Sequence, residues 1–131
     1  MVVRIFLALV GAFHLANGLA MLAFPGAWAA AVVHFGAPDH LHFHFIADIA
    51  MAFLVSGAGM LLGARKGSAN AGWAACGAAW PALHALLHLK EWMLGGVPAA
   101  TRDAVSEGIG VILIGALGVL LAWFRYREGD A

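Results

Sequence analysis

Charged residues are scarce in this sequence. Only 11% of its 131 residues are charged, whereas a soluble globular domain carries roughly 25%. Seven Lys and Arg residues balance seven Asp and Glu residues, so the formal net charge is zero. Without a basic excess, a nucleic-acid partner is not expected. The few charges present are also too few to cover a soluble globule with polar surface.

Cysteine is nearly absent as well. The single residue, Cys76, excludes a disulfide within the chain and gives no indication of the redox compartment. We expect Cys76 to fill a buried position, as unpaired cysteines usually do. No internal repeat or low-complexity tail is evident, so the sequence predicts one domain over residues 1–131.

Apolar residues dominate what remains. They make up 63% of the chain, and the mean hydropathy is +0.90. About 20 apolar residues cross ~30 Å of hydrocarbon as a helix, and helices satisfy the backbone where lipid offers no hydrogen-bond partner. The sequence therefore predicts an all-α integral membrane protein, a four-helix bundle. Its expected spans are residues 2–24, 41–62, 69–94 and 104–124.

Two features refine this topology. The segment Ala27–Phe35 follows Pro25-Gly26, is too short to span and carries Trp28, a residue typical of membrane interfaces. It predicts a short interfacial helix between the first two spans. We expect residues 2–24 to be a retained span and not a cleaved signal peptide, because the run is long and lacks a small-residue cleavage site.

The basic residues predict the orientation. With four spans, both termini and the middle loop share one side of the membrane, and that side holds five of the seven Lys and Arg residues. Cytoplasmic loops carry the excess of such residues. The sequence therefore predicts a bacterial inner-membrane protein with both termini in the cytoplasm.

Seven histidines are unusual in so apolar a chain, and helical spacing sorts them. Residues three, four and seven apart share one face of a helix. In the second span, His44, Asp48 and Met51 have this spacing, and His40 lies one turn earlier. His42 falls on the opposite face. The three closely spaced histidines of the run "PDHLHFHFIADIAMAFL" thus reduce to one stripe.

The first and third spans carry comparable stripes. On the third span His84, His88 and Glu91 follow one face, with Trp80 just behind. On the first span His14 and Asn17 are three apart and Met21 continues the stripe. Counted along the helices at ~1.5 Å per residue, the polar groups of the three spans reach similar depths in the outer half of the membrane. The deepest layer is His14, Asp48 and His84; the next is His44 and His88; the outermost is Glu91, His40 and Glu107.

Ionisable groups inside a bilayer are expensive and usually functional or mutually paired. Imidazole with carboxylate suits zinc, iron or copper, and Met21 and Met51 could add soft sulfur. We expect a transition-metal site in the periplasmic half, serving redox chemistry or metal handling. Its predicted ligands are His44, Asp48, His84 and His88, with His14 as a further ligand. Asn17, Glu91, His40, Glu107, Met21 and Met51 are expected at its periphery.

Other functions remain open at this stage. Haem b is an alternative cofactor for electron transfer, with His14 and His84 or His44 and His88 as axial ligands. The polar set is also compatible with a non-enzymatic site for a quinone or lipid headgroup, or with a partner subunit. The spacing does not decide whether the protein is an enzyme. Gly59 and Gly63 form a small-xxx-small pair that serves helix packing or a homo-oligomer contact.

Three stretches resemble a group of small bacterial four-helix membrane proteins of unknown function. These are "FHLANGLAMLAFPGAWAA", "HFHFIADIAMAFLVSGAGML" and "AAWPALHALLHL", which together cover most of the chain. The core "HFIADI" in the second span carries most of the likeness, although Ala47 stands where the group often has arginine. The resemblance implies the four-helix fold and a bacterial inner-membrane location, and it implies no activity.

Overall fold

The computed structural model describes residues 1–32 and 43–128. Within these residues the chain is helical and has no strand, which confirms the all-α prediction. The elements are α1 (Val2–Ala23), α2 (Pro25–Val32), α3 (Phe43–Gly63), the 3₁₀ turn η2 (Ser68–Asn70), α4 (Ala71–Gly95), α5 (Thr101–Glu107), the π-helix η3 (Gly108–Leu113) and α6 (Ile114–Arg127).

Three helices in the described part of the chain are long and apolar enough to cross a membrane. They are α1, α3 and the continuous helix Thr101–Arg127 formed by α5, η3 and α6. The 25-residue helix α4 has the length but is not among them, because Pro81, two histidines and the Lys90-Glu91 pair lower its hydropathy. The short helix α2 begins at Pro25, two residues before the predicted interfacial segment, whose last three residues lie outside the described ranges.

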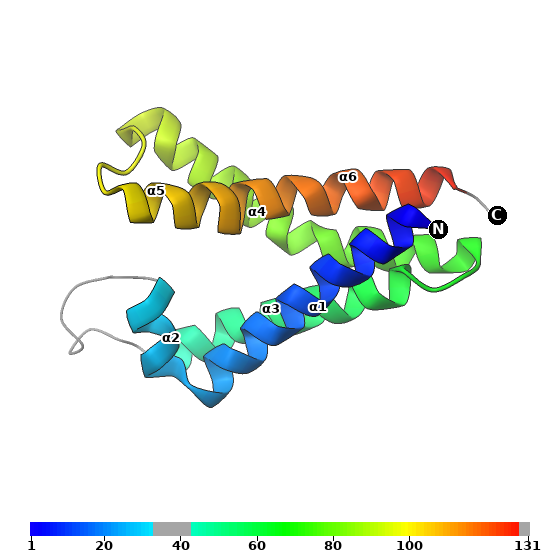
Figure 1. Cartoon of the computed structure of the whole chain (residues 1–131), viewed down its shortest axis with the longest axis horizontal. Helices are drawn as coiled ribbons and strands as arrows, with labels where there is room; N and C mark the ends of the chain where they lie inside the picture. The colour runs from blue at the N-terminus through cyan, green and yellow to red at the C-terminus, as the bar shows by residue number, and fades with distance from the viewer. Residues whose placement is uncertain (33–42, 129–131) are drawn as a thin grey trace.

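Both termini lie at one end of the molecule, and α2 and α5 lie at the other (Figure 1). The amino group of Met1 is 3.6 Å from Oε1 of Glu128, which brings the two ends of the described chain together. The helices α1 and α3 run side by side, and they diverge from α6 and the second half of α4 toward the end with α2 and α5 (Figure 1).

Glycines let the helix backbones approach closely. A Cβ atom at Gly57 of α3 would lie 2.7 Å from the carbonyl oxygen of Gly11 in α1. On the other side of α3, a Cβ at Gly59 would lie 2.8 Å from Cα of Gly77 in α4, and one at Gly63 would meet Ala74. Small residues commonly permit such contacts between membrane helices. Gly59 and Gly63 therefore pack within the chain, and the homo-oligomer contact stays a prediction.

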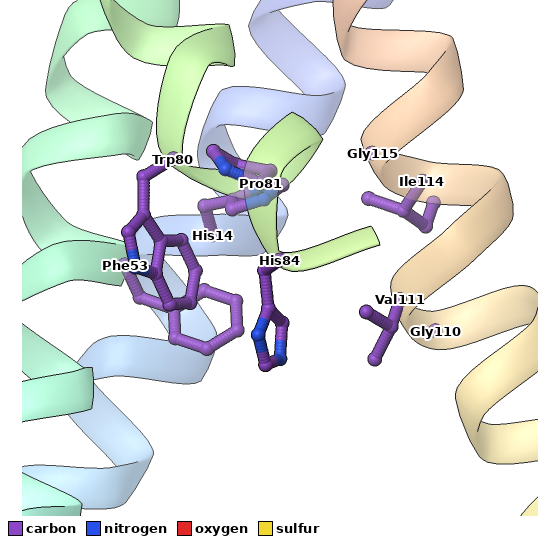
Figure 2. Close-up of a pocket in the computed structure, with 9 residues that line it drawn as sticks. All are labelled: His14, Phe53, Trp80, Pro81, His84, Gly110, Val111, Ile114 and Gly115. Carbon is purple, nitrogen blue, oxygen red and sulfur yellow. The ribbon is translucent and has the colours of Figure 1, made fainter. Parts of the chain in front are cut away.

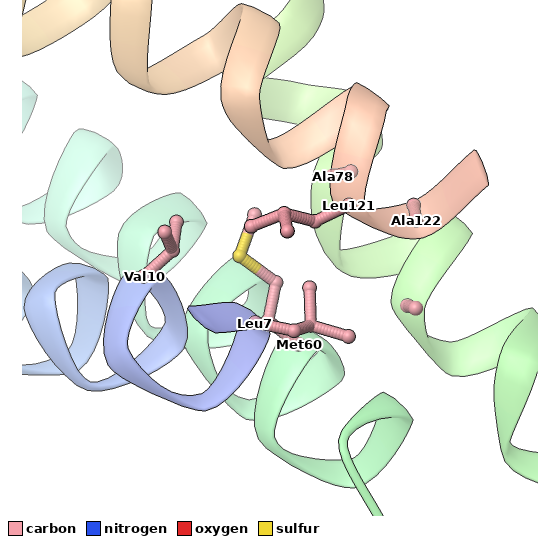
Figure 3. Packing of buried hydrophobic residues seen from close by; sticks show 7 residues of the cluster. Leu7, Val10, Met60, Ala78, Leu121 and Ala122 are labelled. Atoms are coloured by element: carbon pink, nitrogen blue, oxygen red, sulfur yellow. The ribbon is translucent and has the colours of Figure 1, made fainter. Parts of the chain in front are cut away.

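The main apolar core lies at the end that holds the termini. Met60 of α3 is fully buried and reaches between α1, α4 and α6 (Figure 3). Its neighbours in the core are Leu7, Val10, Ala74, Ala78, Leu121 and Ala122. A second cluster, with Met21, Ala29, Ile46 and Ala50, holds α2 against α1 and α3. Cys76 is exposed, so the prediction of a buried cysteine is wrong: the inward positions of α4 belong to neighbouring small residues.

Arg125 ties α6 to the loop between α3 and α4. Its side chain is buried, and it donates hydrogen bonds to three backbone carbonyl oxygens, those of Gly63 at 2.9 Å, Arg65 at 3.0 Å and Gly67 at 2.6 Å. A guanidinium has several donors in a fixed fork and no acceptor, which suits a group of converging carbonyls. The last carbonyl of α3 is thereby satisfied, as helix ends require.

We predict that Gly77→Ala destabilises the protein while Gly72→Ala does not. The added Cβ at position 77 would lie 2.5 Å from the backbone nitrogen of Met60, and such overpacking costs about 1–3 kcal/mol. Nothing lies within 4 Å of a Cβ at Gly72 on the same helix, so this control gains only helix propensity. Equilibrium unfolding in detergent micelles measures both. Equal stability of the two variants would contradict the close contact of α3 and α4.

We also predict that Arg125→Met loosens the loop between α3 and α4. Hydrogen bonds from charged donors are worth about 1.5–3 kcal/mol each, and the variant leaves three carbonyls without their donor. Tryptic cleavage after Arg65 and Lys66 should accelerate several-fold. The exposed Arg127, which lies over the ring of Trp123 at 5.6 Å, supplies the control Arg127→Met, whose cleavage rate should match that of the wild-type protein.

Candidate functional site

The predicted metal ligands do not gather in one place. His44 and Asp48 pair with each other across 3.6 Å at the start of α3, and their side chains are 93% and 64% exposed. Met51, on the same stripe, is also exposed. The inner face of α3 belongs instead to the stripe that includes Ile46 and Ala50. The structure therefore does not bring His44 and Asp48 to α4. His40 and His42 lie outside the described residues.

On α1 the three predicted residues have separate roles. His14 is 1% exposed, and its Nδ1 lies 2.8 Å from the carbonyl oxygen of Val10. Asn17 accepts a hydrogen bond of 2.9 Å from Nε1 of Trp28, and so anchors α2 to α1. Met21 is buried in the second apolar cluster, with its sulfur 3.9 Å from Nδ2 of Asn17.

The second half of α4 and the end of α5 hold a polar cluster. Nδ1 of His88 lies 3.2 Å from Oε2 of Glu107 and 3.8 Å from Oε2 of Glu91. Nε1 of Trp92 donates to the same oxygen of Glu107 at 2.7 Å, which fixes that carboxylate. Nδ1 of His88 is buried and lacks the alignment of a hydrogen bond to any described residue. Two carboxylate oxygens thus lie within 4 Å of one buried imidazole nitrogen.

A row of ring contacts links this cluster to His14 across three helices. The ring of His14 is 5.4 Å from that of Phe53, which is 4.8 Å from that of Trp80. Trp80 stacks on His84 at 5.0 Å, with 12° between the ring planes, and His84 meets His88 edge to face at 4.8 Å. Such pairs hold aromatic side chains in defined orientations.

A small pocket lies where this row faces the last helix (Figure 2). Its volume is about 10 Å³, which is room for about one water molecule. Figure 2 shows the rings on one side, Val111 and Ile114 on the other, and His84 between them. The lining residues are His14, Phe53, Trp80, Pro81, His84, Gly110, Val111, Ile114 and Gly115.

Two irregularities of the backbone meet at this pocket. Pro81 lies inside α4, where it removes one rung of the hydrogen-bond ladder and favours a bend. Opposite it, η3 is a π-helix, a rare form that is frequent at functional sites. Gly115 fits directly against the carbonyl of Pro81, since a Cβ there would lie 2.5 Å from that oxygen. Packed aromatic rings thus form one wall of the pocket, and an irregular helix forms the other.

No three His, Cys, Asp or Glu side chains in residues 1–32 and 43–128 stand close enough to form a ready-made metal site. A haem held by His14 and His84 needs both imidazoles on opposite sides of one iron, yet the rings of Phe53 and Trp80 follow one another between them. The other predicted haem pair includes the exposed His44. The haem prediction therefore requires a different arrangement of these side chains.

Sequence reasoning missed two parts of the site. Phe53 has no polar atom and was not among the candidates, although it lies three residues from Ala50 and four from Gly57 on the inner stripe of α3. No particular residue type marks a π-helix in a sequence. Three glycines at 108, 110 and 115 are the only local signal of an irregular segment there.

The comparisons with known proteins give no family for this chain. No protein-family model, no curated protein and no solved structure matches it. The resemblance to small four-helix membrane proteins therefore stays a hypothesis, and the function must be inferred from the site.

Proposed function

We propose that this protein is a bacterial inner-membrane protein that binds the ring headgroup of a lipid-soluble, quinone-class molecule in the pocket between α1, α3, α4 and η3. The observation that carries the proposal is the pocket itself. It combines stackable rings, an apolar wall and two imidazoles, and ligand sites typically join an apolar lining to a few polar groups that orient the ligand.

The depth of the pocket favours a ligand that dissolves in the membrane. His14 lies nine residues before the end of α1 at Ala23, which is roughly 14 Å along an α-helix. That is about half of the ~30 Å hydrocarbon thickness. A ligand at this depth reaches the site from the lipid, and water-soluble metabolites do not.

The pocket is small, so a ring ligand has to part its two walls. Its volume of about 10 Å³ has room for about one water molecule. We propose that one six-membered ring stacks beside Trp80 and His84 when the irregular helix η3 moves away from them, while an attached isoprenoid or alkyl tail lies outside among the lipid chains. Within the described residues, His84 has ring contacts but no hydrogen bond, so its nitrogens are available to such a headgroup.

The proposed topology has four spans with both termini in the cytoplasm. Three helices meet the length and hydropathy of a span, and α4 is the fourth. Its two histidines are partly buried, and Lys90 and Glu91 lie near its end, where they can reach the membrane surface. The shared end of the two termini requires an even number of crossings. The excess of basic residues at that end, with Arg65, Lys66, Arg125 and Arg127, favours the cytoplasmic side.

Filling the pocket tests the proposal. Gly110 lines the pocket, and nothing lies within 4 Å of a Cβ placed there, so we expect Gly110→Leu to fold normally and to occupy the ligand space. Decylubiquinone, a short-chain quinone, should bind the wild-type protein in nanodiscs with one site per chain by calorimetry. Its affinity should fall at least about tenfold in Gly110→Leu, equivalent to 1.4 kcal/mol.

The matched control is Gly72→Leu, because Gly72 also has open space at its Cβ and does not line the pocket. Its affinity for decylubiquinone should equal that of the wild-type protein. The proposal is wrong if neither decylubiquinone nor its reduced hydroquinone form shows saturable binding to the wild-type protein. It is equally wrong if Gly110→Leu and Gly72→Leu bind alike.

A second candidate is a divalent transition-metal ion at the polar cluster of His88, Glu91 and Glu107. One observation favours it: the buried Nδ1 of His88 has two carboxylate oxygens within 4 Å. Ligand atoms about 2.0–2.1 Å from a zinc ion in tetrahedral geometry are spaced by comparable distances. Glu91, whose side chain is 60% exposed, would have to turn inward, and Trp92 would hold Glu107 as an outer partner of the site.

Metal analysis of protein purified in detergent tests this second candidate. We expect close to one equivalent of zinc, iron or copper in the wild-type protein, loss of that metal in His88→Gln, and its retention in His44→Gln. His44 supplies the control because its side chain is exposed and its partner is Asp48, which does not belong to the cluster. Metal-free wild-type protein with an intact fold would refute the metal site, and an absorption spectrum of the same sample checks for haem b.

A further inference from the structure

A second and larger cavity lies between α4 and α6. Its volume is about 340 Å³, which falls in the ~300–1,000 Å³ range of ligand sites. None of the described residues that line it is charged, and it shares no described lining residue with the pocket beside η3. We call it the alanine groove; its lining residues are Ala75, Ala78, Ala79, Ala82, Val119, Ala122, Trp123 and Tyr126.

The two walls of the alanine groove differ in height. Ala78 and Ala122 are buried where α4 meets α6 (Figure 3), and they form its floor. On the α4 side the remaining lining residues are also alanines, so that wall is low. On the α6 side Trp123 and Tyr126 are more than half exposed and form a high aromatic wall. The result is a trough on the outside of the helix pair.

The position of the alanine groove matches one leaflet of a membrane. On each helix its lining residues extend over seven positions, from 75 to 82 and from 119 to 126, which is roughly 10 Å along the axis. That is about two thirds of one leaflet, whose share of the ~30 Å hydrocarbon thickness is half. Tyr126 lies at the end that holds the termini, and Trp and Tyr are typical of membrane interfaces. The groove thus follows the path of an acyl chain from the headgroup level inward.

Positive charge stands at the mouth of the alanine groove. The guanidinium of Arg127 lies over the ring of Trp123, 5.6 Å from its centroid, and within residues 1–32 and 43–128 it has no ion pair. Glu128 lies instead beside the amino group of Met1 and the buried Arg125. Basic side chains at a membrane surface attract anionic lipid headgroups.

The neighbouring loop adds to this charge. Arg65 and Lys66 are both exposed, and the hydrogen bond from Arg125 to the carbonyl oxygen of Arg65 holds their loop against the end of α6. The mouth of the alanine groove therefore combines aromatic side chains with unpaired positive charge, which is complementary to an anionic headgroup above an apolar chain.

The shape of the alanine groove suits an acyl chain better than a helix of a second copy. Membrane helices approach closely where small residues lie on the contact surface. Here only the α4 wall has small residues, while Trp123 and Tyr126 project on the other side. A helix is about 10–12 Å across with its side chains and would meet these rings, whereas a thin and flexible alkyl chain can lie along the alanines below them.

We propose that the alanine groove binds one anionic phospholipid of the cytoplasmic leaflet. One acyl chain lies along the alanines between α4 and α6, and the phosphate lies beside the guanidinium of Arg127. The many weak contacts of the chain with the groove add up to a sizeable attraction, and the charge selects the headgroup. The inference rests on the proposed topology and is independent of the quinone site.

A pair of lipids with identical acyl chains tests the choice of headgroup. Native mass spectrometry of the detergent-purified protein should show that the first phosphatidylglycerol binds at least about fivefold more tightly than the first phosphatidylcholine, the factor expected from one basic residue beside the headgroup. Arg127→Met should abolish this preference. The control Lys90→Met removes an exposed positive charge near the other end of α4 and should keep it.

A second pair of variants tests the groove itself. Ala79 and Ala116 are both exposed, but only Ala79 lines the alanine groove, so we expect both leucine variants to fold. Ala79→Leu should weaken binding of the first lipid of either kind at least about fivefold, because a displaced acyl chain loses its buried methylene contacts. Ala116→Leu should bind both lipids as the wild-type protein does.

Three results would overturn the inference. They are equal affinity of the wild-type protein for the two lipids, equal binding by Ala79→Leu and Ala116→Leu, and a changed oligomeric state of Ala79→Leu with unchanged lipid affinity, which would assign the groove to a second copy. Ala79→Leu should bind decylubiquinone as the wild-type protein does, because Ala79 does not line the pocket beside η3. Failure of the quinone proposal therefore leaves this inference standing, and the reverse also holds.

Discussion

The close approach of α3 to its two neighbours sets the shape of the whole molecule. Gly57 contacts the backbone of α1 at Gly11, and Gly59 contacts that of α4 at Gly77. Because glycine has no side chain, the helix backbones can come together at the end that holds the termini. Toward the other end, the large rings of Phe53 and Trp80 stand between α3 and α4. The same pair of helices is thus joined at one end and held apart at the other.

The pocket is a consequence of this wedge. The helices diverge here, and the two rings leave part of the space between them open. The facing wall of this space is the irregular helix η3. Arg125 fixes the loop beyond the tight end, so the helices are anchored there. Structure, site and proposed ligand therefore depend on where along α3 small residues give way to aromatic ones.

The sequence predicts the helical class well, because long apolar runs leave a membrane chain few alternatives. It predicts less of the site. Periodicity correctly places His44, Asp48 and Met51 on one face of α3, yet it cannot say which face turns inward. That choice is made by Gly57, Met60 and Ala50, which pack against other helices, and the histidine stripe is left outside. On α4 the predicted stripe of His84 and His88 does turn inward, where His84 stacks on Trp80 and His88 lies beside Glu107 of α5.

The central claim is that the ring headgroup of a quinone-class molecule binds between the row of rings and η3. Photoaffinity labelling tests it most directly, with an azido-substituted quinone probe in native membranes and mapping of the adducts by mass spectrometry. The account predicts adducts on Phe53, Trp80 and Ile114 that excess unlabelled quinone suppresses. Adducts confined to outward-facing residues such as Leu86 and Val119, or adducts that excess ligand does not suppress, would contradict it.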